Sequence, residues 1–365
     1  MQEVELFTKA VMLGQSNKLD DLYQSLDTFN ELLDSDYGYE NQSEIHRQIG
    51  KLYFKLSDIN QSASHFNFGL EHTKMGTKTW CDIKLDQAQL NLTKQLGHLN
   101  NNAIYLDIIK YADNKTTNHA YIKAHIELGN AKYSDQERDK NDWHVKALSL
   151  AEEAGDIELQ IQALIGLGKS ELSGRSDSID WFLVALDMAR QNKYQTLEAQ
   201  ALISLGDIGY SDKYNATIDW YLQAIPITKQ TGNHKLLVDA LLGLGDKKAN
   251  YIDGSQINFG PNTQLMWFKN ALDVANQISD TKSQIKTLKK LINYFEHEND
   301  IPQMNFYLSE LNRFTPPKKT GKRKSSDLVK DTQVDSNKLN TSSMFTRNKT
   351  NVSSSKNSDG KNKSL

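Results

Sequence analysis

The sequence predicts an all-α solenoid built from stacked helical hairpins, because two motifs recur in step along it. Four of the five tryptophans repeat at a near-constant spacing. They are Trp143, Trp181, Trp220 and Trp267, which lie 38, 39 and 47 residues apart. A Leu-Gly pair recurs upstream of each of them, with glycines at Gly129, Gly168, Gly206 and Gly245, spaced 39, 38 and 39 residues apart. Self-similarity at a period near 40 residues is the sequence signature of a repeat architecture.

Each repeating unit contains two stretches with apolar residues at helical spacing, joined by a short polar turn. The first stretch ends in the Leu-Gly pair, and the second carries the tryptophan, followed four residues later by alanine and an aliphatic residue. A single helical hairpin cannot bury both of its faces, so the hairpins must stack. We expect the glycines to allow close approach within a hairpin and the tryptophans to pack between hairpins. Stacking of a ligand on the tryptophans is the alternative.

The hairpins follow one another along residues 1–314, which we expect to form one body of about seven to eight units. Residues 2–34 are predicted to form the first hairpin, 45–54 with 66–70 the second, and 80–94 with 103–111 the third. The clearest units occupy 119–280, and 282–295 with 303–314 form the last hairpin. An insert at 250–262 has the composition of a structured loop and stretches one period to 47 residues.

The final segment, 315–365, has a different composition from the rest of the chain. It contains 12 Lys and Arg against 4 Asp, whereas the whole chain carries a net charge of −3, so the body is acidic and the tail is basic. The tail has ten serines and almost nothing to bury, which predicts disorder. Pro316 and Pro317 mark the boundary, because proline resists continuation of a helix.

The repeat resembles the tetratricopeptide repeat in its long-period form of about 40 residues. The residues that carry the resemblance are the Leu-Gly pair, the aromatic residue after the tryptophan (Phe182, Tyr221, Phe268), and the Ala-Leu pair that follows. His144 takes the aromatic position in one unit, and the proline that often ends the second helix is absent. The resemblance implies a right-handed α-solenoid that binds a peptide or a helix of a partner protein in its concave groove.

The geometry of that family implies which residues face the concave side. They lie one and four positions after each glycine: Asn130 and Tyr133, Lys169 and Leu172, Asp207 and Tyr210, Asp246 and Ala249. Three positions before each glycine the chain has Ile126, Ile165, Ile203 or Leu242, where members that clamp chaperone C-termini need Lys or Asn in some repeats. A two-carboxylate clamp is therefore not expected.

No pattern in the sequence predicts catalysis, a metal site or a cofactor. Residues 163–170 end in Gly-Leu-Gly-Lys-Ser, but Ala163 replaces the first glycine of a phosphate loop and the repeat places the segment inside a helix. The nine histidines give no ligand set with Cys81 or a carboxylate. The lone cysteine favours a reducing compartment, and no signal peptide or membrane span is found, so we expect a cytoplasmic protein.

One short basic motif stands out in the tail: Lys318, Lys319, Lys322, Arg323 and Lys324. Such a cluster suits an import receptor, which would make the protein nuclear in a eukaryote, or phosphate groups of a nucleic acid. A solvated tail is the plain alternative. The sequence thus predicts a non-enzymatic adaptor or scaffold, with a nucleic-acid-associated factor and a self-assembling structural protein as the alternatives.

Overall fold

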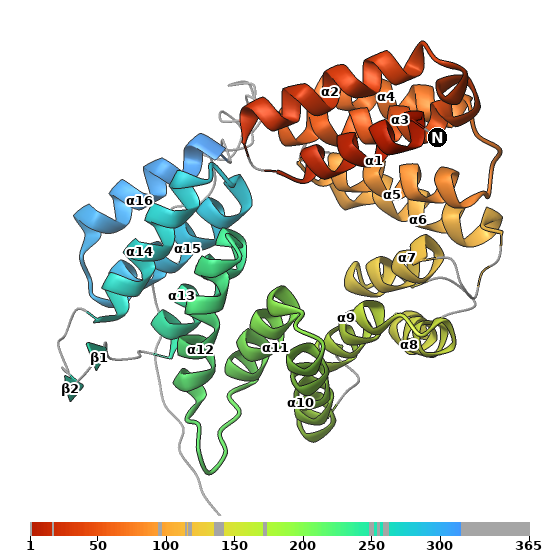
Figure 1. Cartoon of the computed structure of the whole chain (residues 1–365). Coiled ribbons are helices and arrows are strands. Elements are labelled where there is room, and N and C mark those ends of the chain that lie inside the picture. Colours follow the sequence, from red (N-terminus) through yellow and green to blue (C-terminus); the bar gives the residue numbers. More distant parts are fainter. Residues whose placement is uncertain are drawn as a thin grey trace, which may run out of the picture. The chain divides into compact units, whose positions relative to one another are not determined.

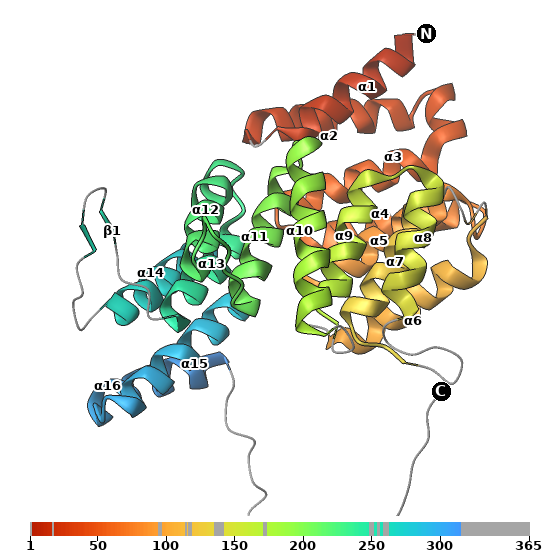
Figure 2. The ribbon, with the colours of Figure 1, turned by 90° about the horizontal axis from the view of Figure 1, so that it is seen from below.

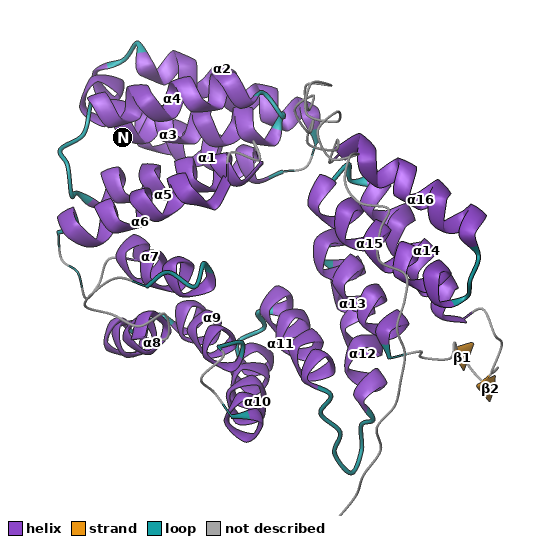
Figure 3. Cartoon of the chain, turned by 180° about the vertical axis from the view of Figure 1, so that it is seen from behind, coloured by secondary structure: helices purple, strands orange, loops and turns teal. Residues whose placement is uncertain are grey.

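The computed structural model describes residues 2–314, apart from residue 17 and the segments 94–96, 114, 116–118, 135–141, 171–173, 248–251, 254–255 and 258–262. The described part is an all-α solenoid of sixteen helices with one small pair of strands (Figures 1 and 3). The tail, with its predicted disorder and its basic motif at Lys318, Lys319, Lys322, Arg323 and Lys324, lies outside the described residues. No helix among the described residues is long and apolar enough to cross a membrane.

The helices pair into eight consecutive hairpins. These are α1 (Gln2–Gln15) with α2 (Leu19–Leu33), α3 (Asp36–Lys55) with α4 (Ile59–Glu71), α5 (Lys78–Thr93) with α6 (Gly97–Tyr111), α7 (His119–Asn130) with α8 (Asp142–Ala154), α9 (Ile157–Gly168) with α10 (Arg175–Gln191), α11 (Gln195–Ile208) with α12 (Thr217–Gln230), α13 (His234–Asp246) with α14 (Thr263–Gln277), and α15 (Thr281–His297) with α16 (Ile301–Phe314). The predicted helical repeat is confirmed in every hairpin, including the first and the last.

The turns between hairpins are short because a residue with a left-handed backbone conformation (positive φ) is followed directly by the N-cap residue of the next helix. Gly155 has φ of 66° and Gly232 has φ of 66°. Each is followed by a residue that caps the next helix: Asp156 accepts from the backbone N–H of Leu159, and Asn233 from that of Leu236. Glycine suits the first position because it has no Cβ, and Asp or Asn suits the second because its side chain satisfies a free N–H of the helix start.

The insert between α13 and α14 contains β1 (Ile252–Asp253) and β2 (Gln256–Ile257). These two-residue strands pair antiparallel, with Ile252 opposite Ile257. The prediction of a structured loop holds for this part of the insert, and the remainder of 250–262 lies outside the described residues.

Odd-numbered and even-numbered helices make different contacts. Each odd-numbered helix from α1 to α13 contacts the next odd-numbered helix as well as its own hairpin partner. Within the described part of the chain, no even-numbered helix contacts another even-numbered helix. The odd-numbered helices are therefore closer together, as expected for the inner side of a curved stack, and the hairpins fan outward from them (Figures 1 and 2).

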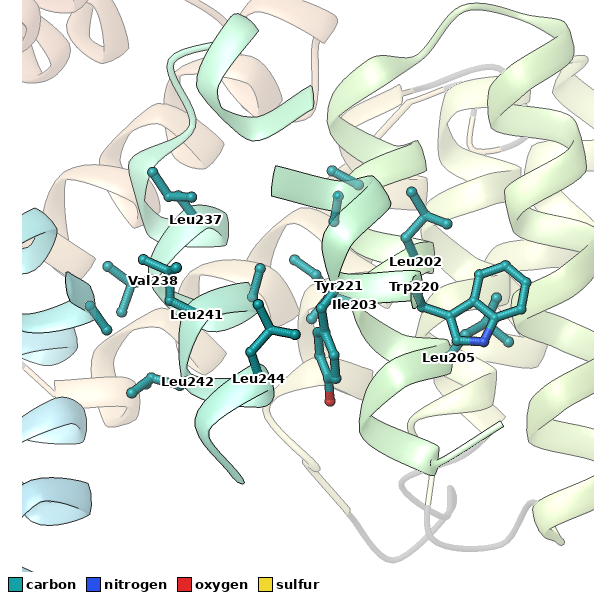
Figure 4. Close-up of a cluster of buried hydrophobic side chains, with 14 of the residues drawn as sticks. Leu202, Ile203, Leu205, Trp220, Tyr221, Leu237, Val238, Leu241, Leu242 and Leu244 are labelled. Carbon is teal, nitrogen blue, oxygen red and sulfur yellow. The ribbon is translucent and has the colours of Figure 1, made fainter. Parts of the chain in front are cut away.

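The core is a layer of apolar side chains that runs from one hairpin to the next. Between α11 and α13, for example, Leu202 and Leu205 face Leu241 and Leu244 across the ring of Tyr221 (Figure 4). All five of these side chains are buried. Because each layer is shared by consecutive hairpins, no hairpin completes its core alone.

Three of the four repeated tryptophans pack in this layer. Trp143, Trp220 and Trp267 are only 1%, 3% and 5% exposed, which confirms a packing role for them. Trp181 differs, because it is only partly buried at the edge of the same layer. Trp181 therefore also packs against the core, but less of its side chain is buried than in the other three.

Candidate functional site

Each Leu-Gly glycine makes room for an aromatic ring. A methyl group added at Gly206 would lie 2.5 Å from the ring of Tyr221, and one added at Gly243, on the next odd-numbered helix, would lie 2.2 Å from it. His144 is held in the same way between Gly129 and Gly166. The glycines thus let the ring after each tryptophan pass between two odd-numbered helices, rather than bringing two backbones together as expected.

The same arrangement recurs with phenylalanine in the other two clear units. A methyl group at Gly168 would lie 2.4 Å from the ring of Phe182, and one at Gly245 would lie 2.3 Å from Phe268. His144 therefore does occupy the aromatic position of its unit, as the sequence indicated. The four rings share one position but differ in whether they carry a polar atom at the tip.

The polar tips bind the residue that follows the glycine. Tyr221 Oη donates a hydrogen bond of 2.8 Å to Asp207 Oδ1. His144 Nε2 lies 3.2 Å from Asn130 Oδ1. A ring that begins on an even-numbered helix thus reaches through to the side chains that the odd-numbered helix exposes.

We call the residues directly after the four glycines the post-glycine row: Asn130, Lys169, Asp207 and Asp246. All four are exposed. Asn130 and Asp207 are held by the rings beneath them, and Asp246 forms an ion pair of 2.7 Å with Lys290 of α15. Lys169, which lies above a phenylalanine, has no ion pair or hydrogen-bonding side-chain partner among the described residues.

A groove of about 740 Å³ runs over α7, α9 and α11. We call it the odd-helix groove; Asn130 and Lys169 of the post-glycine row line it. Its other polar lining includes Lys123, Gln162 and Gln200, and its apolar floor includes Ile126, Ile165 and Leu197. The groove thus offers both hydrogen-bonding and apolar contacts to a bound chain.

Three of these lining residues were not anticipated from the sequence. Lys123, Gln162 and Gln200, together with Asp239, lie six positions before the four glycines, and we call them the upstream row. Each stands seven positions before a member of the post-glycine row, and a separation of seven residues returns to the same face of a helix. A search for polar residues at that separation within the apolar helices would have found them.

A second hollow of about 460 Å³ lies over α3, α5 and α7, and Lys123 and Glu127 line both hollows. On its wall, Arg47 Nε lies 2.7 Å from Asp86 Oδ2, and Arg47 also pairs with Asp82 at 3.5 Å. Burial raises the pKa of Asp86, although the charge of Arg47 opposes this shift. The charges of this hollow are therefore already engaged in ion pairs with one another, whereas Lys169 of the odd-helix groove has no ion pair among the described residues.

The charges of Lys169 and Asp207 are poorly solvated although both side chains remain exposed. Desolvation by the surrounding walls lowers the pKa of Lys169, an effect that nearby Asp207 and Asp239 partly offset. Desolvation also raises the pKa of Asp207, against the hydrogen bond from Tyr221 and the charge of Lys169. An opposite charge stabilises a charged group in such surroundings more strongly than it would stabilise the same group in open water.

Tyr133 and Tyr210, the other two residues expected on the concave side, lie in the turns within their hairpins. The indole N–H of Trp143 donates to the carbonyl oxygen of Tyr133 at 2.9 Å, and that of Trp220 to the carbonyl oxygen of Tyr210 at 3.0 Å. The ring of Tyr210 stacks on Trp220, with 5.8 Å between the ring centroids. Both tyrosines thus pack against tryptophans and do not line the odd-helix groove. Leu172 and Ala249 lie outside the described residues.

The segment that resembles a phosphate loop has the wrong geometry for one. Lys169 stands at the C-terminal cap of α9, whereas a phosphate loop leads from a strand into the N-terminus of a helix. The helix dipole favours a cation at this end. Among the described residues, no group of three or more His, Cys, Asp or Glu is placed to hold a metal ion.

No protein-family model and no curated protein matches this chain. Solved structures do resemble it. Aspartyl phosphate phosphatase F from Bacillus subtilis gives a TM-score of 0.52 at 12% identity, over 80% of this chain and 75% of that one. A Rap protein complexed with competence and sporulation factor gives 0.52 at 10% identity, over 86% of this chain and 97% of that one. At these identities the likeness shows the fold alone, a helical-repeat solenoid.

Proposed function

We propose that the chain is a non-enzymatic adaptor of the tetratricopeptide-repeat type, which binds a peptide or a helix of a partner protein in the odd-helix groove. The observation that carries the proposal is the pair of polar rows on otherwise apolar helices. The post-glycine row changes from amide to ammonium to carboxylate between units, while the residues that pack beside it stay apolar or glycine. Packing requires similar residues in each unit, whereas recognition of one partner permits them to differ.

The Rap protein of similar fold was solved with competence and sporulation factor bound, which supports ligand binding by this kind of solenoid. The size of the groove, about 740 Å³, also suits a short segment of a partner chain. The basic motif of the tail remains a separate prediction, as an import signal or a phosphate contact, and self-association remains the alternative to partner binding.

The test is quantitative capture of partners from a lysate of the host with three forms of the full chain. The groove variant combines Lys169→Glu with Asp207→Lys, which leaves the net charge unchanged. The control variant combines Lys146→Glu with Asp187→Lys at exposed positions of α8 and α10, which also leaves the net charge unchanged. We expect the partner to be lost from the groove variant and retained by the control. Retention by the groove variant and loss from the control would place the binding surface on the even-numbered helices.

A further inference from the structure

Consecutive members of the post-glycine row present opposite charges. Lys169 caps α9 and forms no ion pair with any described residue, and Asp207 lies on α11, where the hydroxyl of Tyr221 donates a hydrogen bond to its carboxylate. The two charges affect one another's pKa but form no ion pair within 4.0 Å. Of the other charges nearby, Asp239 is already paired with Lys286 at 2.5 Å. Lys169 and Asp207 are therefore available to a ligand.

The distance between these two positions follows from the packing of the helices. Helices α9 and α11 are in contact, and packed helices lie about 8–10 Å apart. An extended peptide of the polyproline type advances about 3.1 Å per residue and returns to the same face after about three residues. Side chains three positions apart in such a peptide would therefore face Lys169 and Asp207 together.

The amides of the groove favour an extended ligand over a helical one. Asn130, Gln162 and Gln200 line the groove from three successive odd-numbered helices. A side-chain amide both donates and accepts hydrogen bonds, so it can bind the free N–H and C=O groups of an extended backbone. Asn130 already bonds His144 and Glu127, and Gln162 bonds Glu158 and Lys123. Each of these amides keeps a further N–H and a further lone pair, which an extended backbone can use and a helical ligand, whose backbone groups are satisfied internally, cannot.

We propose that the chain selects an extended peptide that carries an acidic and a basic side chain three residues apart, the acidic one at Lys169 in the groove and the basic one at Asp207, which follows α11's glycine next to the groove and is not part of its lining. Tyr221 is the positioning residue for the basic end, because its hydroxyl fixes the acceptor. This inference rests on the proposed function and adds the chemistry of the partner to it. A ligand that supplies both charges gives Lys169 and Asp207 the opposite charges that they lack in the free chain.

The test begins with selection of random peptides of about twelve residues, displayed on phage, against the purified full chain. Peptides that are selected are then synthesised with a fluorescent label, and their affinities are measured by anisotropy. We expect enrichment of an acidic and a basic residue three positions apart. Selection of peptides without this spacing overturns the inference and leaves the proposed function standing. Failure to select any peptide contradicts the proposed function and the inference with it.

Single variants then assign each charge. Lys169→Met and Asp207→Asn should each weaken the selected peptides by about tenfold to a hundredfold, the usual effect of removing one partner of a charged hydrogen bond. Lys146→Met and Asp187→Asn remove exposed charges of the same kinds from α8 and α10 and should leave the affinity unchanged. Equal losses in both pairs of variants would show a general charge effect and overturn the assignment.

Two further variants separate recognition from folding. Exchange of the charges, Lys169→Asp with Asp207→Lys, should select peptides in which the acidic and basic residues have changed places. Tyr221→Phe should keep the thermal stability close to that of the original chain, because Phe182 and Phe268 occupy the same position in other units. It should nevertheless reduce the preference for Lys over norleucine at the basic position by about tenfold. An unchanged preference would remove Tyr221 from the site.

Discussion

Replacement of His144 by phenylalanine should remove part of the acid sensitivity of the fold. The imidazole is 4% exposed, and its Nδ1 atom is buried without a hydrogen-bond partner. Desolvation lowers its pKa from the ordinary value of 6.5 to about 4, although the charge of Glu127 acts in the opposite direction. A six-membered ring is compatible with the position, because Tyr221 lies between Gly206 and Gly243 in the same way.

The sign of the effect follows from which state takes up the proton. As the pH falls below 6.5, His144 becomes protonated in the unfolded chain but stays neutral in the folded one until about pH 4. Stability is therefore complete above pH 6.5 and is lost progressively as the pH falls toward 4. At pH 5, about 1.5 units below the pKa of the unfolded chain, the free energy of unfolding should be about 2 kcal/mol lower than at neutral pH. The phenylalanine variant should not show this loss.

The measurement is urea unfolding of both proteins at pH 8 and pH 5, followed by far-UV circular dichroism. At pH 8 the variant loses one hydrogen bond and one unpaired buried nitrogen, so its free energy of unfolding should lie within about 2 kcal/mol of the original. The decisive quantity is how the difference in free energy of unfolding between the two proteins changes from pH 8 to pH 5. Other groups that titrate, such as His46, are present in both proteins and cancel in this comparison. If this difference is the same at both pH values, the imidazole of His144 is not buried in its neutral form. The control is His297→Gln, which removes a histidine from an exposed site in α15.

Three further outcomes are expected. Trp220→Ala should lower the free energy of unfolding by about 3–5 kcal/mol because it leaves a cavity at a buried site. Trp181→Ala should lower it clearly less, because Trp181 is only partly buried, and equal losses in urea unfolding would contradict this. Gly243→Ala should destabilise the fold despite the better helix propensity of alanine, because its methyl group would lie 2.2 Å from the Tyr221 ring; a raised melting temperature would contradict that packing. Removal of 315–365 should leave the far-UV ellipticity per molecule almost unchanged, and a strong fall would move the predicted domain boundary.

The post-glycine row shows how far sequence reasoning could describe the candidate site. Its four positions could be named in advance because they keep a constant offset from a repeated glycine. Their partners could not, since Asp246 pairs with Lys290 on α15, 44 residues later, and such pairs depend on how consecutive hairpins are rotated. Gln162 and Gln200 were missed because they lie two helical turns before that row, in segments that were recognised by their apolar periodicity.

The sequence by itself determined the helical repeat and the position of the ring-bearing residues. This information is local: apolar periodicity and a fixed spacing fix which segments become helices and which faces they bury. Only the tertiary structure decided that the glycines admit a ring, that Trp181 stays partly exposed, and that Lys169 has no ion pair with any residue in the described part of the chain. Those features arise from contacts between residues far apart in the chain, and the distance and angle between stacked helices are set by all the side chains of the layer together.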